Sequence, residues 1–382
     1  MSTYAQDGVD VHEGDSFSAF AGKICKSTYG FCPFVTVHDL SSGNFRGPRG
    51  YTLNVDRFPM LKDCIETLAP DGEGTKSVIN AAAGNLRVAA RNVFAMTGGD
   101  ITKWGGKRTV FTSVLDTSSL GKEGDEVNLA FRELMLGLYD VALEQELVVL
   151  NGETAELGVC VGSENPRAKI KYNWAGVMAG LYHKQKMILG NTLAEGQVVM
   201  ALHEPTLRSN GISSARKALQ MQFSEQWWNY PGSLPFIQAC AEPSTIYDRF
   251  LEAANGWTIS HVIPMHLITH VTGGSIRSKL AEDMLFRLGL SADLHDLYEP
   301  PQIMKLCKEW RRMPDEDAYE TWSCGQGALV VIDEDSVDSF TLLANDHGIR
   351  TKVCGRICQK PTPQVRIVSK FGSGKEIVYK AA

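Results

Sequence analysis

The sequence predicts an α/β (or α+β) protein built from two domains. A length of 382 residues suits two domains. Strand-like apolar runs alternate with helical patterns along the chain, and polar turns containing glycine follow several of the strands. A polar stretch at 185–195, with Gly190 and Asn191, is interpreted as the junction between domains at 1–188 and 189–382.

The composition is that of a globular protein, with 43% hydrophobic and 21% charged residues. The net charge of −6 gives no reason to expect nucleic acid or an anionic membrane as a partner. We find no apolar run near the roughly 20 residues of a membrane span, and no signal-peptide core at the N-terminus. The 9 cysteines form no CxxC motif, so we expect free thiols and a cytoplasmic protein.

The first half begins with a predicted helix capped by Asp15 or Ser16. A long helix is predicted from Ser77 to Thr97, ended by two glycines that leave Asp100 on a loop. A further helix is predicted over 126–144. Strands are predicted at 34–37, 64–69, 109–115, 147–150 and 172–181.

The turn Asp71-Gly72-Glu73-Gly74-Thr75-Lys76 lies between a strand and a helix start. Glycines allow close approach of the backbone to an anion, and a helix N-terminus adds N–H groups and the positive end of its dipole. Lys76 adds a full positive charge, and Asp71 and Glu73 suit a divalent cation that accompanies a phosphate. The sequence therefore predicts a phosphate site here, with an ordinary solvated turn as the alternative.

Three carboxylates, those of Asp71, Asp100 and Glu153, lie beside glycines at the predicted ends of strands or helices. We expect them to converge, although each one alone is typical of a loop charge. A separate loop at 41–51 carries Arg46 and Arg49, which we interpret as a solvated loop rather than a phosphate clamp.

The second half repeats the order of strand, polar glycine turn and helix. A strand at 197–202 leads to Arg208-Ser209-Asn210-Gly211 and a helix from Ile212. Thr272-Gly273-Gly274 is a second candidate anion turn. His261, His266 and His270 are interpreted as core or surface histidines rather than zinc ligands, because Pro264 interrupts the segment. Cys324 is interpreted as a small buried residue.

With these motifs in place, the chain resembles the aminoimidazole ribonucleotide synthetase family, the phosphoribosylformylglycinamidine cyclo-ligases, in the same order from Tyr4 to about Val353. The resemblance rests on short segments in register, namely YAQDGVD at 4–10, DGEGTK at 71–76, Ala95-Met96 with Asp100, GETAE at 152–156, SNG at 209–211, TGG at 272–274 and CGxG at 324–327.

The resemblance implies the two-domain PurM-like fold and a homodimer in which the mixed sheets of the N-terminal domains meet. It implies a ligase of purine biosynthesis that uses ATP and Mg²⁺ to close the ring of a ribonucleotide substrate, formylglycinamidine ribonucleotide. The N-terminal domain would bind ATP and Mg²⁺, and the C-terminal domain would bind the substrate.

The roles implied by the resemblance are assigned as follows. Nucleotide would be bound by Gly72, Gly74, Thr75, Lys76, Gly152 and Thr154, and Mg²⁺ by Asp71, Asp100 and Glu153. Substrate would be bound by Ser209, Asn210, Gly211, Thr272, Gly273 and Gly274. The catalytic residues would be Lys76, Asp100 and Arg208.

The chain departs from the family pattern at several of these positions. Arg208 stands where relatives usually carry a histidine, and arginine cannot transfer a proton near neutral pH. Gly99 replaces a usual asparagine, Glu73 replaces a small apolar residue, and a glycine-rich run is reduced to Tyr29-Gly30-Phe31. Two other functions therefore stay open, which are an ATP-dependent enzyme of the same superfamily with another acceptor and a nucleotide-binding protein without catalysis.

Overall fold

A computed structural model describes residues 11–41 and 47–381, and the motif at 4–10 and Arg46 lie outside this part. The chain separates into two compact units. The first contains the residues up to Ile101 together with Lys107–Gln185, and the second contains Thr102–Gly106 together with Lys186–Ala382.

The first unit is built on a four-stranded mixed sheet in the order β3-β6-β4-β5. Its strands are β3 (Cys64–Gly72), β6 (Tyr172–His183), β4 (Lys107–Thr117) and β5 (Val148–Glu156). Only β4 and β5 are parallel to each other. A separate hairpin pairs β1 (Val35–Asp39) with β2 (Arg49–Leu53), and the short helix η1 (Pro59–Asp63) leads into β3.

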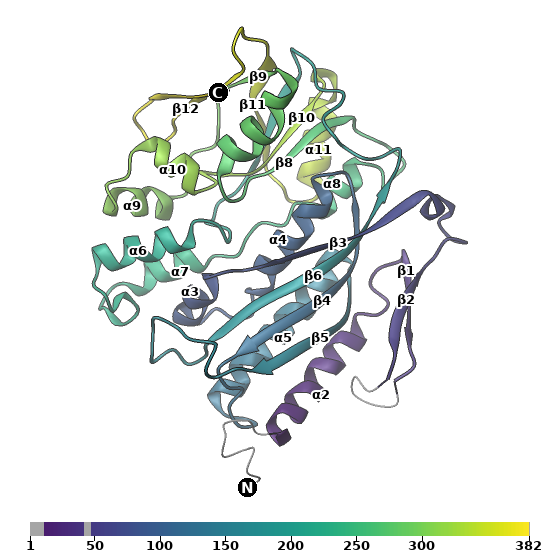
Figure 1. Ribbon diagram of the computed structural model, residues 1–382, viewed down its shortest axis with the longest axis vertical. Helices are drawn as coiled ribbons and strands as arrows, with labels where there is room; N and C mark the ends of the chain where they lie inside the picture. The colour runs from purple at the N-terminus through teal and green to yellow at the C-terminus, as the bar shows by residue number, and fades with distance from the viewer. Residues whose placement is uncertain (1–10, 42–46, 382) are drawn as a thin grey trace. The chain divides into compact units, whose positions relative to one another are not determined.

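The two faces of the four-stranded sheet have different surroundings. The face carrying Phe111, Ser113 and Trp174 is covered by α2 (Val11–Ser27) and α5 (Glu126–Gln145), which lie along it in Figure 1. We call the other face the outer face; there Leu68 is 69% and Val114 is 37% exposed. Side chains aligned across strands share a face, so Glu153, paired with Val114, belongs to the outer face.

The predicted long helix after Lys76 is wrong in two respects. The structure contains α3 (Lys76–Ala83), which ends at Gly84 with a left-handed φ of 74°, and a separate α4 (Ala90–Thr102). Helix α4 also continues through Gly98 and Gly99, so Asp100 lies within a helix and not on a loop. Burial of apolar residues such as Phe94 and Ile101 outweighs the cost of about 1 kcal/mol for each helical glycine.

The second unit is built on a seven-stranded sheet in the order β13-β12-β9-β11-β7-β10-β8. All neighbours are antiparallel except β12 and β9. The strands are β7 (Val198–His203), β8 (Met265–His270), β9 (Ser291–Leu294), β10 (Gln326–Ile332), β11 (Thr351–Cys358), β12 (Gln364–Val368) and β13 (Glu376–Lys380).

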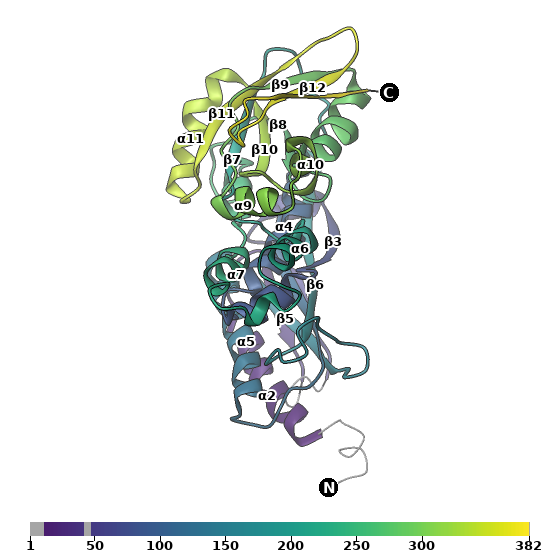
Figure 2. The same cartoon turned by 90° about the vertical axis from the view of Figure 1, so that its left-hand side faces the viewer.

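Strands β7 and β10 are buried on both faces, which explains their continuous apolar sequences. One face packs on α8 (Asp248–Ala254) and α11 (Val337–Asp346), where the rings of Phe250 and Phe340 meet edge to face at 4.9 Å. Figure 2 shows α11 beside β11 on one side of this sheet and α10 on the other.

The remaining helical segments of the second unit connect these strands. They are α6 (Ile212–Gln222), η2 (Trp227–Asn229), α7 (Leu234–Ala241), η3 (Arg277–Leu285), η4 (Phe286–Leu288), α9 (Gln302–Trp310), α10 (Asp315–Thr321) and η5 (Glu334–Ser336). No helix in the described part of the chain is both long enough and apolar enough to cross a membrane.

Candidate functional site

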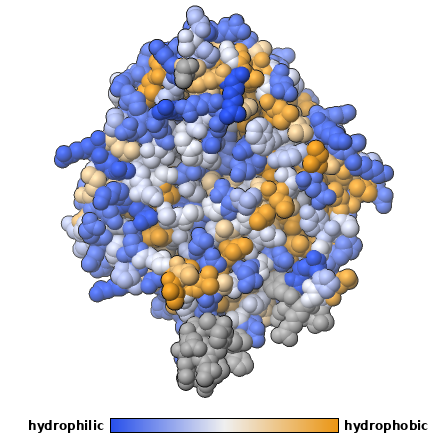
Figure 3. Space-filling view, viewed as in Figure 1, coloured by the Kyte–Doolittle hydropathy of each residue, from blue (hydrophilic) through white to orange (hydrophobic). Residues whose placement is uncertain are grey.

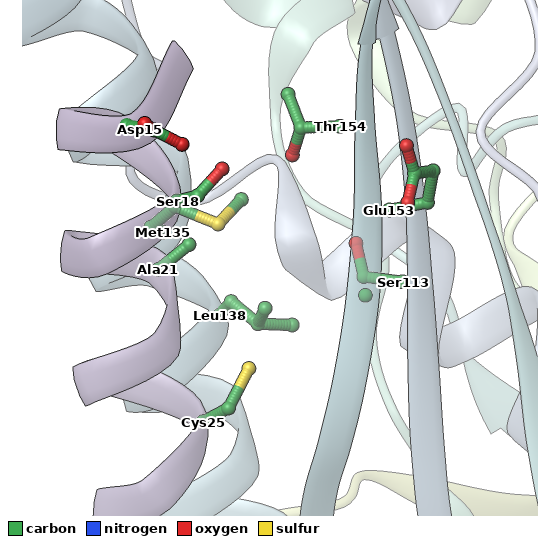
Figure 4. A pocket seen from close by; sticks show the side chains of 10 residues that line it. Asp15, Ser18, Ala21, Cys25, Ser113, Met135, Leu138, Glu153 and Thr154 are labelled. Atoms are coloured by element: carbon green, nitrogen blue, oxygen red, sulfur yellow. The ribbon is translucent and has the colours of Figure 1, made fainter. Parts of the chain in front are cut away.

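A pocket of about 250 Å³ in the first unit is lined by three of the predicted nucleotide or metal residues, Gly152, Glu153 and Thr154. Figure 4 shows Ser113 and Thr154 on the side of the strands that faces helix α2 with Asp15, Ser18, Ala21 and Cys25, and Glu153 turned away from that helix. Met135 and Leu138 of α5 complete its apolar side.

The lining of this pocket combines carboxylates and hydroxyls with an apolar floor. Ser113 Oγ accepts a hydrogen bond from Trp174 Nε1 at 2.9 Å, which fixes one wall. Burial raises the pKa of the Cys25 thiol to about 12, so this cysteine stays protonated and is a poor nucleophile. The ten lining residues include no lysine or arginine, so this pocket suits the uncharged part of a ligand better than a phosphate.

The predicted phosphate turn connects β3 to α3, and its two glycines are required by the backbone. A Cβ at Gly72 would lie 2.8 Å from the carbonyl oxygen of Trp174, and Gly74 has a left-handed φ of 57°. Thr75 is the N-cap residue of α3, and Lys76 is its first residue. The strand, glycine turn and helix start that the sequence predicted are therefore present.

Two of the charged side chains of the turn, those of Glu73 and Lys76, are buried, whereas Asp71 is exposed. Lys76 is fully buried, and its Nζ donates a hydrogen bond to Asn92 Oδ1 at 3.1 Å. Glu73 is also fully buried and accepts a hydrogen bond from Asn80 Nδ2 at 2.8 Å. Burial raises the pKa of Glu73 to about 8, although the Tyr172 hydroxyl, the Lys76 charge and nearby amides oppose this rise. Neither side chain extends into solvent as the phosphate prediction expected.

The structure does not bring together the three carboxylates expected to bind Mg²⁺. Asp71 is on β3 and Glu153 on β5, the opposite edges of the sheet, about 14 Å apart at ordinary strand spacing. Asp100 is near enough to Tyr182 to raise its pKa, and Tyr182 pairs with Ile65 near the other end of β3 from Asp71.

Ligands of one Mg²⁺ ion lie within a few ångströms of one another. The described residues contain no group of three His, Cys, Asp or Glu side chains placed to hold a metal. These three carboxylates therefore do not fit one ion within one chain, and we assign no step to it.

In the second unit, Arg208 lies at the centre of a buried polar cluster. Its NH1 donates to Glu204 Oε2 at 2.9 Å and to the carbonyl oxygen of Thr245 at 3.1 Å. The guanidinium also lies 5.5 Å from the centre of the Tyr247 ring. Glu204 and Arg208 are 0% and 1% exposed, so this is a buried ion pair that depends on its hydrogen bonds.

His270, the last residue of β8, completes this cluster. Arg208 NH2 lies 2.6 Å from His270 Nε2, and because arginine can only donate, Nε2 must accept. Burial, together with the charges of Arg208, Lys103 and Lys279, holds the pKa of His270 well below its usual value. A neutral imidazole that accepts at Nε2 carries its proton at Nδ1, and Nδ1 is buried without a protein partner.

This contact joins the two predicted substrate turns, because Ser209–Gly211 follows Arg208 and Thr272–Gly274 follows His270. Trp322 joins them again, donating from Nε1 to the Gly211 carbonyl at 3.1 Å and accepting from Ser275 Oγ at 2.9 Å. The structure therefore brings these six predicted residues into one region of the second unit.

Backbone strain and unpartnered hydroxyls mark the same region. Of five described non-glycine residues with left-handed φ, three lie here, namely Arg208, Ser275 and Cys324. Such conformations cost about 1–3 kcal/mol each and concentrate at functional sites. The Oγ atoms of Ser209 and Ser323 are buried without a protein partner. Buried hydroxyls normally have partners, so these two are available to a ligand.

Sequence reasoning missed Glu204 and undervalued His270. Glu204 directly follows the apolar strand β7 and lies four residues before Arg208. A carboxylate at the end of a buried strand needs a partner, so this spacing could have indicated a buried ion pair. Cys324 is fully buried, as predicted. The contact between His270 and Arg208 depends on the folded arrangement of the second unit, because the two residues are 62 positions apart in the sequence.

We expect Glu73→Gln to change the pH dependence of stability. Between its ordinary pKa of 4.5 and the raised value of about 8, the native carboxyl keeps a proton that the unfolded chain releases. The free energy of unfolding of the unsubstituted protein should therefore fall as pH rises through this window, by up to about 1.4 kcal/mol per pH unit. Glu73→Gln should lose this component in urea titrations between these pH values.

Glu66→Gln provides the control, because Glu66 is exposed on β3, the strand that leads into the turn with Glu73. Its pH profile should parallel that of the unsubstituted protein. A Glu73→Gln profile with the same slope as both would show that Glu73 is ionised in the folded state and would refute its assigned protonation.

Known proteins resemble this chain along nearly its whole length. Residues 194–368 match the family described as AIR synthase related protein, C-terminal domain. The phosphoribosylformylglycinamidine cyclo-ligase of Prochlorococcus marinus (strain MIT 9312) is 25% identical over 363 residues, covering 94% of this chain and 95% of the relative. That of Methanobrevibacter smithii is 25% identical over 387 residues, covering 99% and 100%.

Solved structures share the fold at low sequence identity. The E. coli hydrogenase maturation protein HypE matches with a TM-score of 0.56 and 11% identity over 94% of each chain. A HypE structure in complex with ATP matches with a TM-score of 0.54 and 10% identity over 84% of this chain and 85% of that one. The second half of this chain thus matches the AIR synthase related C-terminal domain, and the resemblance of the chain to the aminoimidazole ribonucleotide synthetase family is confirmed along nearly the whole sequence.

Proposed function

We propose that this protein is an ATP-dependent cyclo-ligase that converts formylglycinamidine ribonucleotide to aminoimidazole ribonucleotide, releasing ADP and phosphate. Relatives with that name match it over at least nine-tenths of its length. The nine cysteines are free thiols, which supports a location in the reducing cytoplasm.

The observation that carries the proposal is the joined pair of turns in the second unit. Ser209–Gly211 and Thr272–Gly274 meet beside Arg208 and His270, where buried hydroxyls lack protein partners and backbone strain is concentrated. A phosphorylated sugar offers many acceptors to such hydroxyls and to backbone N–H groups. We assign the substrate to this region.

Nucleotide binding is supported by the HypE structure of the same fold, which is a complex with ATP. The nucleotide is assigned to the first unit because of its glycine turn. The glycine turn and the N-terminus of α3 would hold phosphate oxygens. Because the side chain of Lys76 is buried, its charge would act through the turn. Gly152 and Thr154 line the pocket without cations beside β5, at the opposite edge of the sheet from the turn.

The proposed chemistry proceeds in two steps. The γ-phosphoryl group of ATP is transferred to the amide oxygen of the substrate, and ADP leaves. The amidine nitrogen then attacks the activated carbon, the C–O bond breaks and phosphate leaves with the former amide oxygen. Such transfers depend mainly on positioning and charge stabilisation.

Arg208 is proposed as a positioning residue in this reaction. Its guanidinium donates hydrogen bonds to Glu204 and to His270 Nε2. Through these bonds Arg208 would orient the imidazole of His270 and the turn that begins at Ser209. His270 Nδ1–H would then be the donor available to substrate, and a neutral imidazole can donate this hydrogen bond without carrying charge.

A homodimer is the proposed assembly. The outer face of the four-stranded sheet leaves Leu68 and Val114 exposed, and exposed apolar side chains that share a sheet face are a feature of interfaces. Figure 3 shows hydrophobic side chains among polar ones on the side of the molecule viewed there.

The activity prediction concerns Ser209→Ala. The unsubstituted protein, given ATP, Mg²⁺ and formylglycinamidine ribonucleotide, should form ADP and aminoimidazole ribonucleotide. Ser209→Ala should lower kcat/KM roughly 10- to 100-fold, because a hydrogen bond to a charged group is lost. Its stability should be unchanged, since Ser209 Oγ has no protein partner.

Exposed Ser224→Ala is the matched control and should retain full activity. ATP hydrolysis without aminoimidazole product would instead favour another acceptor, and nucleotide binding without turnover would favour a non-catalytic protein. Equal kcat/KM for Ser209→Ala and Ser224→Ala would remove Ser209 from the substrate site.

The assembly prediction concerns Leu68→Asp. Light scattering of the unsubstituted protein should give about twice the chain mass of 41.9 kDa. Leu68→Asp should shift the protein toward the mass of one chain, because a carboxylate would be buried at the interface. Leu342→Asp, at a position 65% exposed on α11, should leave the dimer intact. A dimer unaffected by Leu68→Asp would exclude the outer face as the interface.

A further inference from the structure

A second pocket, unrelated to the residues assigned above, lies in the second unit where four adjacent strands end or begin. Strand β7 ends at His203 and β11 begins at Thr351, while β9 and β12 end on the same side. The backbone N–H of His203 donates to the Arg350 carbonyl at 2.9 Å, and that of Asp296 donates to the Cys354 carbonyl at 3.0 Å. These hydrogen bonds fix the strand ends that surround a cavity of about 440 Å³.

The pocket is lined by more cationic side chains than carboxylates. Lys352 and Lys370 both approach Asp296, at 2.8 and 3.2 Å, and this pairing lowers the pKa of Asp296. Glu299, at the edge of the pocket, pairs instead with Lys305 at 2.6 Å. Within the described chain, the Arg350 guanidinium forms no hydrogen bond or ion pair. The pocket is therefore lined by two carboxylates, Asp296 and Glu299, and three cations, Arg350, Lys352 and Lys370, and Lys305 adds a fourth positive charge through its pair with Glu299.

Tyr298 holds these cations in place. Lys352 Nζ lies 5.0 Å and Arg350 Cζ 5.9 Å from the centre of its ring, and the His203 ring lies 4.6 Å away. Burial raises the pKa of Tyr298, and burial with the Arg350 charge lowers that of His203. Both side chains are therefore neutral near pH 7 and can each donate a hydrogen bond to an anion.

We propose that this pocket binds the phosphate group of a small phosphorylated molecule. The arginine fork suits two oxygens of a phosphate, and the lysines supply further charge for a dianion. A cavity of about 440 Å³ also leaves room for a group of sugar size attached to the phosphate. The proposal uses none of the residues assigned to the reaction, so it holds or fails independently of the proposed function.

The test is calorimetric titration of the full chain at constant ionic strength with inorganic phosphate, ribose 5-phosphate and ribose. Both phosphorylated probes should bind the unsubstituted protein, and ribose should not. Tighter binding of ribose 5-phosphate than of inorganic phosphate would identify an ester as the ligand, and equal binding would identify phosphate alone.

Arg350→Gln should weaken phosphate binding roughly tenfold or more, because both fork hydrogen bonds are lost. Arg350→Lys keeps the charge without the fork and should bind with intermediate affinity. The control is Arg287→Gln, at a position whose side chain is 74% exposed, and it should bind like the unsubstituted protein. Equal phosphate affinity in Arg350→Gln and Arg287→Gln, or absence of phosphate binding by the unsubstituted protein at millimolar concentration, would overturn the proposal.

Discussion

The buried contact between Arg208, Glu204 and His270 is the interaction on which the candidate substrate site depends. Removing an arginine and a glutamate from water costs several kcal/mol per ion, and only close, well-aligned partners offset this. Glu204 at 2.9 Å and His270 at 2.6 Å are such partners. In this contact Glu204 balances the charge of Arg208, and His270 supplies an imidazole from another strand.

In the first unit, the candidate nucleotide site depends on a glycine turn and not on a buried ion pair. Its glycine turn precedes a helix N-terminus, but the side chains of Glu73 and Lys76 are buried, where Glu73 accepts from Asn80 and Lys76 donates to Asn92. One face of its sheet is covered by helices, and the outer face carries exposed Leu68 and Val114. Because Asp71 and Glu153 lie on opposite edge strands, the order of the strands alone prevents them from sharing an ion within one chain.

Much of the fold could be predicted from hydrophobic periodicity. Strands β4, β6 and β7 and helices α5 and α6 agree with the sequence within a few residues. The break at Gly84 follows the ordinary preference of glycine for a left-handed helix C-cap, whereas the continuation of α4 past Gly98 could not be predicted, because tertiary burial overrides glycine propensity there. For the site, the sequence located the turns but not the orientations of Glu73 and Lys76. Those orientations, like the pairing of Arg208 with His270, depend on contacts between distant segments.

The most direct test of this account is nitrogen NMR of the His270 ring across the pH range in which ordinary histidines titrate. The contact with Arg208 requires a neutral imidazole with its proton on Nδ1 and Nε2 accepting. We expect the Nδ1–H tautomer throughout that range, with no protonation step. A ring that protonates near the ordinary histidine pKa of 6.5, or that carries its proton on Nε2, would contradict the account.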